Sequence, residues 1–491
     1  MYYPGKQKFM ELAEKGNVIP VYREILADFS TPLSAFLKID KGEFSYLLES
    51  AEGGEHMGRY SFLGSDPSLI LESRGKVVSV KRGDEVETYT VREDPISEIK
   101  SIMDKFRFVK VDGLPRFCGG LVGYIGYDMV RFIENIPDEN VEDFDIPDMQ
   151  LVLTDTILIF DHVDHKIKVV SNAMISGDAG EAYDTACGKI DRIIGRLKTG
   201  APRSEKIEAR PAPAKAESNF SEEEFCGIVD RAKEYIRAGE VIQIVLSQRL
   251  KRRTGMDAFS IYRALRSINP SPYMYYLQFG EYRIVGSSPE ILVRCDEELV
   301  EVRPIAGTRK RGEDEEEDLR MEKELLADPK ERAEHIMLVD LGRNDIGRVC
   351  DYATVKAREI MRIEKYSHVM HIVSDVVGRL RKDKDIYDLM RATFPAGTVT
   401  GAPKVRAMEL IDELENIRRG PYAGCVGYIS FSGNIDMCIT IRTIVMSGDT
   451  AYIQAGAGIV LDSEPAREYQ ETMNKAMAMI KAIEFAERGL E

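Results

Sequence analysis

Short apolar runs separated by polar or glycine-rich turns fill the first 160 residues of the chain. Two of them, 44–50 and 60–64, have the aromatic and aliphatic content of strands and flank a polar loop at 51–59. A third, 119–127, is apolar and rich in glycine, but it lacks the Gly-x-Gly-x-x-Gly spacing and the lysine of phosphate-binding loops. This pattern predicts a buried strand and no nucleotide site.

The pattern changes twice before the middle of the chain. Residues 182–197 repeat apolar positions at helical spacing, and the segment that follows is rich in proline, alanine and charged residues. Such a composition is typical of an exposed linker. We expect a linker at 201–220 that separates an N-terminal domain, 1–200, from a C-terminal domain, 221–491.

The C-terminal half opens with a helix and a buried strand. Ser221 and Glu224 form a capping box ahead of a helix that is expected to end near residue 238. The strand at 239–248 places the polar Gln243 among valine and isoleucine. A buried amide is either hydrogen-bonded for structural reasons or directed at a functional site, and both alternatives stay open.

Three further strands are predicted at 275–279, 283–294 and 299–305. The middle one carries Pro289 and Glu290. Proline cannot donate to a strand ladder, and a carboxylate is unfavourable in a strand interior. We therefore expect this strand to be interrupted there, at a functional edge.

A helix is predicted at 330–348, after the start signal of Asp328 and Pro329. Glu331 and Glu334 stand one turn apart on the same surface of this helix, where glutamates are most often solvated. The apolar stripe expected to face a core consists of Ala333, Ile336, Met337 and Leu341.

Strands are predicted again at 424–431, 437–445 and 452–461. The second contains Arg442, and a buried arginine needs an anion from the protein or from a ligand. In the third, Gly456 and Gly458 let a ligand approach the backbone closely. The preceding loop at 395–404 either offers backbone N–H groups and hydroxyls to an anion or is a plain turn.

The final helix carries a second acidic surface. Ser463 is expected to cap this helix. Glu464, Glu468, Glu471 and Lys475 follow at spacings of four, three and four, which place them on one face. Three carboxylates in a row repel one another, so a bound cation explains their arrangement. Mg²⁺ fits, because it takes one or two carboxylates together with water and substrate oxygens.

Composition narrows the classes of function. The chain has 491 residues and a net charge of −16, and it has no basic stripe, so we expect no nucleic-acid partner. No apolar segment has the length of a membrane span, and the first residues lack the core of a signal peptide. Seven scattered cysteines without a Cys-x-x-Cys pair indicate reduced thiols in the cytoplasm.

Several long motifs occur in one order along the chain. They are 47–50 (LLES), 58–64 (GRYSFLG), 304–309 (PIAGTR), 334–345 (EHIMLVDLGRND), 397–404 (GTVTGAPK) and 454–460 (QAGAGIV). Together they resemble the chorismate-utilising enzymes, and among these the large subunits of anthranilate synthase. The resemblance covers essentially the whole chain. It implies an α+β fold of two large, mostly antiparallel sheets packed face to face with helices outside.

The resemblance also implies a reaction, in which chorismate and ammonia give anthranilate and pyruvate at the first step of tryptophan biosynthesis. Mg²⁺ is implied as the cofactor. Glu334 and Glu471 would be its ligands, and Glu331 and Glu468 would bind it directly or through water. The ion would hold the ring carboxylate of chorismate and withdraw charge from the ring as a Lewis acid.

Other site residues are implied in the same way. Glu290 matches the general acid that protonates the departing ring hydroxyl, and His371 matches the histidine that serves pyruvate elimination. His368 lies outside the family pattern and receives no role. Thr398 and Gln243 complete the catalytic set. The implied substrate-binding residues are Gly307, Thr308, Tyr422, Arg442, Gly456, Ala457, Gly458 and Lys475.

Two positions separate the sister activities of this family. Isochorismate and salicylate synthases carry a lysine base at the position of Gln243, and aminodeoxychorismate synthases carry a nucleophilic lysine at the position of Ala306. Glutamine cannot accept a proton from water, and alanine cannot act as a nucleophile. Amination to anthranilate is therefore favoured over aminodeoxychorismate or isochorismate synthesis. The alternative of another class is an inactive, tryptophan-binding regulatory subunit.

The implied partners follow from what the chain lacks. It has no glutaminase segment with a nucleophile-elbow cysteine. The resemblance therefore implies a separate glutamine amidotransferase subunit that delivers ammonia, in a hetero-oligomer expected to be a heterotetramer. It also implies that tryptophan binds as a feedback inhibitor between 47–50 of the N-terminal domain and a later turn. The residues assigned to that site are Ser50, Pro272, Tyr273 and Met274.

Overall fold

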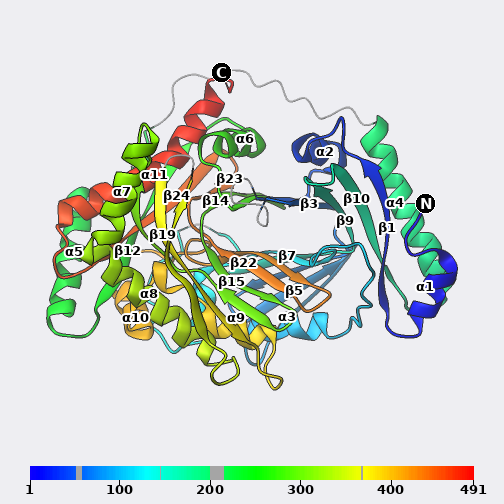
Figure 1. Ribbon diagram of the computed structural model, residues 1–491, viewed down its shortest axis with the longest axis horizontal. Coiled ribbons are helices and arrows are strands. Elements are labelled where there is room, and N and C mark those ends of the chain that lie inside the picture. The colour runs from blue at the N-terminus through cyan, green and yellow to red at the C-terminus, as the bar shows by residue number, and fades with distance from the viewer. Residues whose placement is uncertain (51–57, 144, 200–214, 367–368, 491) are drawn as a thin grey trace.

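The computed structural model describes residues 1–50, 58–143, 145–199, 215–366 and 369–490 (Figure 1). His368, most of the loop 51–59 and residues 201–214 of the predicted linker lie outside the described residues. The chain forms two twelve-stranded sheets, A and B, whose paired strands are antiparallel, with helices on their outer surfaces. The predicted fold class is confirmed.

Sheet A begins at an N-terminal strand and ends at strands of the C-terminal half. Its order is β1 (Val18–Leu26), β10 (Lys166–Met174), β9 (Thr156–Asp161), β3 (Tyr60–Ser65), β2 (Phe44–Glu49), β13 (Tyr273–Phe279), β14 (Tyr282–Ser288), β23 (Thr443–Ser447), β24 (Thr450–Ile459), β12 (Gln243–Arg253) and β11 (Glu217–Ser218). The short β20 (Gly401–Ala402) also pairs with β12.

Sheet B also combines strands of the C-terminal half with strands of the N-terminal half. Its order is β17 (Ile305–Lys310), β19 (Val369–Arg379), β16 (Leu299–Val302), β15 (Ile291–Asp296), β22 (Ile435–Ile439), β21 (Cys425–Ser430), β7 (Gly120–Ile125), β8 (Met149–Thr154), β4 (Leu69–Arg74), β5 (Val77–Arg82) and β6 (Glu85–Thr90). The long β18 (Lys356–Lys365) pairs with β19.

Both halves of the chain contribute to both sheets. N-terminal β2 pairs with β13 in sheet A, and N-terminal β7 pairs with β21 in sheet B. Each sheet therefore contains strands that precede residue 200 in the sequence and strands that follow residue 214. The division into 1–200 and 221–491 stays a prediction about the roles of two segments that share their sheets.

The helices divide between the two outer faces. Those that pack on sheet A are α1 (Lys6–Ala13), α2 (Pro32–Ile39), α4 (Ala179–Thr199), α5 (Glu222–Arg237), α6 (Ala258–Ile268), α10 (Lys404–Leu414) and α11 (Pro465–Glu487). Those on the side of sheet B are α3 (Pro95–Met103), α7 (Glu315–Ala327), α8 (Pro329–Gly347) and α9 (Ile386–Thr393). Two 3₁₀ turns are η1 (Tyr127–Phe132) and η2 (Gly397–Val399). None of the described helices is long and apolar enough to traverse a bilayer.

Apolar side chains fill three layers. One cluster lies between the sheets and joins Tyr46 and Tyr275 of sheet A with Tyr124 and Tyr428 of sheet B. The two largest clusters lie under the helices on the outer face of each sheet, and two smaller ones adjoin α5 with α10 and α7 with β19. A central strand is thus buried on both faces and has a continuous apolar sequence, as β7 does.

The glycines of β7 have a packing role. A Cβ on Gly123 would lie 2.1 Å from the carbonyl oxygen of Gln150 on the neighbouring strand β8. No side chain fits at that distance, so this position requires glycine. The prediction of a buried strand at 119–127 is confirmed.

Helix α8 begins where predicted. Asp328 caps it by accepting hydrogen bonds from the backbone N–H groups of Lys330 and Glu331, and Pro329 occupies its first turn. The predicted core stripe is wrong, because Ala333 is exposed and Ile336 is 48% exposed.

The buried face of α8 is instead formed by His335, Leu338, Val339 and Ile346. His335 Nε2 lies 2.6 Å from Ser374 Oγ on β19, so a polar residue occupies a core position. Hydrophobic periodicity assigns histidine to the solvent side, and the predicted stripe was therefore rotated around the helix.

Two local predictions near the C-terminus are also wrong. The single strand expected at 437–445 is divided into β22 and β23, and Arg442 lies between them, half-buried, with φ of +49°. The reason is that β22 belongs to sheet B and β23 to sheet A, so the chain changes sheets there. Ser463 does not cap α11, whose N-cap is Glu464, because its hydroxyl accepts from the N–H of Val460.

Candidate functional site

The chain crosses between the sheets at two adjacent points. Glu290 lies in the crossing from β14 to β15, and Arg442 lies in the crossing from β22 to β23. The N–H of Ser287 donates to the carbonyl of Arg442 at 3.2 Å, and the N–H of Ile439 donates to the carbonyl of Glu290 at 3.0 Å. The expected interruption at Glu290 is confirmed, and its cause is this passage between sheets.

Glu290 is a buried carboxyl group with one side-chain hydrogen bond. The hydroxyl of Thr398, in η2, donates to Glu290 Oε1 at 2.6 Å, and Glu290 is 5% exposed. Burial raises the pKa of Glu290 to about 8, although the Thr398 hydrogen bond and the charges of Arg442 and Lys475 lower it. A carboxyl group that keeps its proton near neutral pH is suited to act as a general acid.

His371 lies on β19, opposite Thr308 of β17. Its Nδ1 is 2.9 Å from the carbonyl oxygen of Gly307 and 3.1 Å from Thr308 Oγ1. Because a carbonyl can only accept, Nδ1 carries the hydrogen and Nε2 is left as the basic nitrogen. Burial lowers the pKa of His371, so the ring is neutral near pH 7.

The backbone conformation of Gly307 directs its own carbonyl group toward His371. The pairing of β17 with β19 shifts register between Ala306 and Thr308, and Gly307 has φ of +67°. Such a bulge redirects a backbone group at the edge of a site. Gly307 and Thr308 therefore both contact His371, and their predicted binding of substrate stays a prediction.

Gln243 connects sheet A to helix α8, which lies on the side of sheet B. Its Nε2, on β12 of sheet A, donates to Glu334 Oε1 of α8 at 3.2 Å. A Cβ on Gly458 would lie 2.5 Å from Gln243 Nε2 and 3.9 Å from Glu334 Oε1. Gln243 is therefore hydrogen-bonded, and its partner Glu334 is one of the predicted site residues. A role of Gln243 in a functional site stays a prediction.

Helices α8 and α11 bring four carboxylates within electrostatic reach. Burial raises the pKa of Glu334, and the negative charges of Glu331 and Glu471 add to the effect. Burial also raises the pKa of Glu468, again with a contribution from Glu471. Glu334 of α8 and Glu471 of α11, which are far apart in the sequence, therefore act on each other electrostatically.

These carboxylates are not arranged as a ready-made metal cage. Within the part of the chain that the structure describes, no three acidic, histidine or cysteine side chains are grouped to hold a metal ion. Glu331 Oε1 accepts from Arg309 Nη1 at 3.1 Å, and Glu471 pairs with Lys475 at 2.7 Å. The donor set still fits Mg²⁺, which is usually bound by one or two carboxylates together with substrate oxygens and water.

Strand β24 supplies a backbone wall beside these carboxylates. Lys475 Nζ donates to the carbonyl of Gly456 at 3.0 Å. The hydroxyl of Tyr422 would lie 2.7 Å from a Cβ on Gly456, and Ala457 is buried. Burial raises the pKa of Tyr422 to about 12, so its hydroxyl keeps its proton and can donate. An ammonium, a hydroxyl and a close backbone suit a carboxylate ligand.

The four residues assigned to a tryptophan site line one separate cavity. Ser50, Pro272, Tyr273 and Met274 surround it together with aromatic and charged side chains. Tyr273 donates to Asp436 at 2.9 Å, and Arg294 donates to the same carboxylate at 3.0 Å. The cavity shares no lining residue with the one that contains Glu290 and Thr398. A cavity lined by both aromatic and charged side chains suits an aromatic amino acid.

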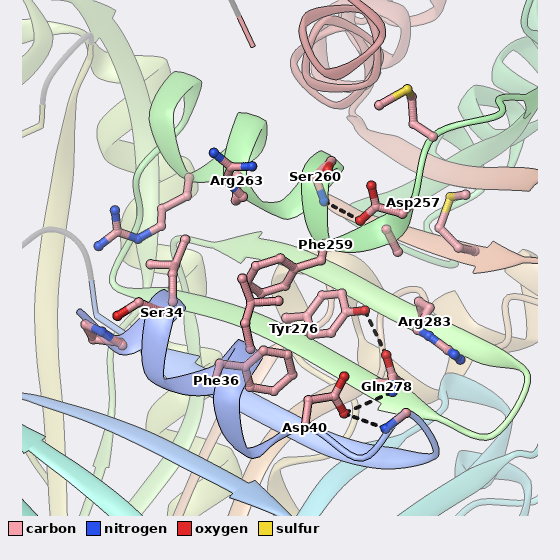
Figure 2. A pocket seen from close by; sticks show the side chains of 18 of the residues that line it. Ser34, Phe36, Asp40, Asp257, Phe259, Ser260, Arg263, Tyr276, Gln278 and Arg283 are labelled. Carbon is pink, nitrogen blue, oxygen red and sulfur yellow. Dashed lines mark hydrogen bonds between the residues drawn. The ribbon is translucent and has the colours of Figure 1, made fainter. Parts of the chain in front are cut away.

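A cavity of about 1310 Å³ lies elsewhere, between α2 and α6 (Figure 2). Its floor carries Phe36, Phe259 and Tyr276, and Arg263 and Arg283 lie at its edges. None of the predicted site residues lines it. The predicted site and this cavity are therefore different places in the molecule.

Sequence reasoning missed two buried charged residues behind the site, Glu415 and Arg419. They are 4% and 2% exposed and form an ion pair at 2.6 Å. Their only sequence signal is the spacing of four residues between opposite charges, which is equally common on solvent-exposed helix surfaces.

Comparison with known proteins shows which family the chain is similar to. A family model described as chorismate binding enzyme matches residues 43–481. Anthranilate synthase component 1 of Acetivibrio thermocellus is 50% identical over 99% of both chains. Its counterpart in Aquifex aeolicus is 53% identical over 99% of this chain and 98% of the relative.

Two solved structures are also similar to this chain. Anthranilate synthase component I from Streptococcus pneumoniae superposes with a TM-score of 0.78 at 36% identity, over 93% of this chain and 98% of that one. The menaquinone-specific isochorismate synthase from Escherichia coli superposes with a TM-score of 0.71 over 97% and 98% of the two chains. Its identity is only 18%, so it shows the shared fold alone.

Proposed function

Because this chain belongs to the chorismate-binding enzymes, we propose that it is the chorismate-aminating component of an anthranilate synthase and converts chorismate and ammonia into anthranilate, pyruvate and water. Identity of about 50% over full length with anthranilate synthase component 1 proteins supports this reaction. The structural observation that carries it is the hydrogen bond from Gln243 to Glu334. A neutral amide beside the carboxylates cannot deprotonate water, whereas ammonia needs no base to act as a nucleophile.

In the first half of the reaction, ammonia bonds to one ring carbon and the ring hydroxyl leaves from another. Glu290 donates its proton as the C–O bond breaks, so that water leaves in place of hydroxide. Thr398 holds this carboxyl group in position. The newly bonded nitrogen releases one proton, which balances the one that Glu290 gave.

In the second half, the ring loses a proton as the bond to the enolpyruvyl oxygen breaks, and the ring becomes aromatic. The enolate that leaves takes up a proton and becomes pyruvate. His371 Nε2 accepts the ring proton, because Nδ1 is committed to Gly307 and the ring is neutral.

Glu334 and Glu471 would hold Mg²⁺, with Glu331 and Glu468 bound directly or through water. When bound, the ion supplies Lewis-acid polarisation of the ring carboxylate. The chain's own groups orient the rest of chorismate. Those proposed for its enolpyruvyl carboxylate are Arg442, Tyr422, Lys475 and the backbone of Gly456, Ala457 and Gly458. Thr308 and Thr398 are proposed to hydrogen-bond the substrate.

Ammonia is proposed to come from a separate glutamine amidotransferase subunit in a heterotetramer. The relatives are called component 1, and this name supports the existence of a second component that acts as partner. A cytoplasmic location is supported by seven cysteines that are all unpaired.

The test is an anthranilate fluorescence assay on the purified chain with chorismate, Mg²⁺ and either ammonium or glutamine. We expect product with ammonium and none with glutamine alone. No product with ammonium would contradict the activity, and product with glutamine alone would contradict the separate partner.

Tryptophan is proposed as a feedback inhibitor that binds the cavity of Ser50, Pro272, Tyr273 and Met274. Ser50 belongs to the N-terminal segment, whereas the proposed catalytic residues all lie in 221–491, which supports a regulatory role for 1–200. Replacing Ser50 with leucine fills the cavity, and we expect the tryptophan concentration for half-inhibition to rise more than about tenfold. Activity without tryptophan should stay unchanged, and inhibition equal to that of the wild type would contradict the assignment.

A further inference from the structure

A fully buried ion pair lies directly behind the proposed site. Arg419 is 2% exposed and Glu415 is 4% exposed. Arg419 Nε donates to Glu415 Oε2 at 2.9 Å, and Nη2 donates to Oε1 at 2.6 Å. Well-packed apolar residues are often as stabilising as a buried ion pair, so stability alone does not explain this one.

The other donors of Arg419 reach two elements of the site. Nη1 donates to the carbonyl of Val399 at 2.7 Å, and Nη2 donates to the carbonyl of Val245 at 2.7 Å. Val399 follows Thr398, and Val245 lies two residues after Gln243 on β12. One guanidinium therefore connects the loop that binds Glu290 to the strand that contacts Glu334.

Glu415 fixes a third element. Its Oε1 accepts from the backbone N–H and the hydroxyl of Ser247, each at 2.8 Å. Ser247 is the register partner of Gly456 on β24. Glu415 therefore holds the part of β12 that pairs with Gly456, and so helps to position the β24 backbone proposed to face the substrate.

Aromatic contacts extend the network to Tyr422. The Arg419 guanidinium lies 4.8 Å from the ring centre of Tyr127 and 5.6 Å from that of Tyr422. The Tyr422 hydroxyl borders Gly456. Arg419 therefore contacts, directly or through one residue, the Thr398 loop, the Gln243 strand and the carboxylate-binding tyrosine.

We propose that Arg419 and Glu415 are positioning residues for the chorismate reaction, and that the planar guanidinium holds Thr398 against Glu290 while it aligns Gln243 and Gly456. This inference rests on the proposed function. Lysine cannot replace arginine here, because its compact ammonium cannot reach the Glu415 carboxylate and the carbonyls of Val399 and Val245 at once, as the planar guanidinium does. Misplacement of reacting groups by about 1 Å lowers rates by about 10²-fold.

The test compares Arg419→Lys with a matched control, Arg252→Lys, in the full chain with ammonium as donor. Arg252 is also 2% exposed, lies on β12, the strand that Arg419 contacts through Val245, and pairs with Glu487 at 2.8 Å. Both substitutions weaken a buried ion pair, so both should lower the melting temperature. Only Arg419→Lys should lower kcat, by about 100-fold, while KM changes little.

A pH profile separates positioning from a general loss of structure. Thr398 lowers the pKa of Glu290 through its hydrogen bond. Displacing Thr398 in Arg419→Lys should therefore move the alkaline limit of kcat to higher pH, and Arg252→Lys should leave it unchanged. Free guanidinium at a non-denaturing concentration should restore part of the activity of Arg419→Ala.

The inference is overturned if folded Arg419→Lys keeps kcat within about twofold of the wild type, or if its pH profile matches that of Arg252→Lys. Should Arg419→Lys not fold, Glu415→Gln gives the same comparison, because it keeps the side-chain shape and loses the charge. A wild-type chain that makes no anthranilate from ammonium contradicts the proposed function itself, so the two failures are distinguishable.

Discussion

Replacing Glu290 with glutamine is expected to lower kcat for anthranilate formation by about 10²–10⁴-fold, the contribution of a positioned general acid. Glutamine fills the same volume and can still accept the hydrogen bond from Thr398. It cannot transfer a proton to the departing ring hydroxyl. The measurement is the steady-state rate with ammonium at saturating chorismate, and KM should change much less than kcat.

The pH dependence of the wild type tests the same assignment. Burial raises the pKa of Glu290 to about 8, so its acid form is present below that pH and is lost as the pH rises through it. Burial lowers the pKa of His371, so its basic form persists below the ordinary histidine range and is lost only on further acidification. We expect a bell-shaped profile of kcat with its alkaline limb near pH 8.

Glu72→Gln is the matched control for Glu290→Gln. Glu72 is a half-buried carboxyl group on β4 whose pKa is likewise raised by burial, and it contacts Gln150 outside the site. Its substitution should leave both kcat and the alkaline limb unchanged. A Glu290→Gln enzyme with kcat within about threefold of the wild type would contradict the general-acid role.

Replacing Glu334 or Glu471 with glutamine is expected to lower kcat/KM by about 10³-fold, because a Lewis acid contributes several kcal/mol to transition-state stabilisation. Each change removes one of the anionic oxygens that Mg²⁺ prefers. The Mg²⁺ concentration for half-maximal activity should rise. Titration calorimetry with chorismate present should show weaker Mg²⁺ binding.

Glu464→Gln provides the control on the same helix. Glu464 is 60% exposed and pairs with Arg467 at 2.9 Å at the start of α11. Its substitution should change neither Mg²⁺ dependence nor rate. Full magnesium-dependent activity in Glu334→Gln or Glu471→Gln would refute these residues as ligands.

Sequence alone identified much of the fold and of the candidate site, for physical reasons that particular residues illustrate. Pro289 and Glu290 are incompatible with a continuous strand, and the structure changes sheets there. Gln243 is unfavourable among apolar neighbours, and the structure pairs it with Glu334. Signals that arise from a local conflict between a residue and its surroundings were therefore reliable.

Other features depend on contacts between distant segments, which a local pattern does not show. His335 has a polar side chain but occupies the core through Ser374, which rotated the predicted stripe of α8. Arg442 follows an apolar run, yet it lies at a crossing between sheets that local pattern cannot show. Arg419 and Glu415 resemble a surface pair until β12 and the Thr398 loop are placed against them.

The proposed conversion of chorismate and ammonia into anthranilate and pyruvate is tested most directly with ¹⁵N-labelled ammonium. The purified chain is incubated with chorismate, Mg²⁺ and this ammonium, and every product is identified by mass spectrometry. We expect ¹⁵N-anthranilate and pyruvate in a one-to-one ratio, with neither formed when the divalent cation is removed by a chelator. An aminated product that keeps its enolpyruvyl group, or a hydroxylated product without ¹⁵N, would contradict it.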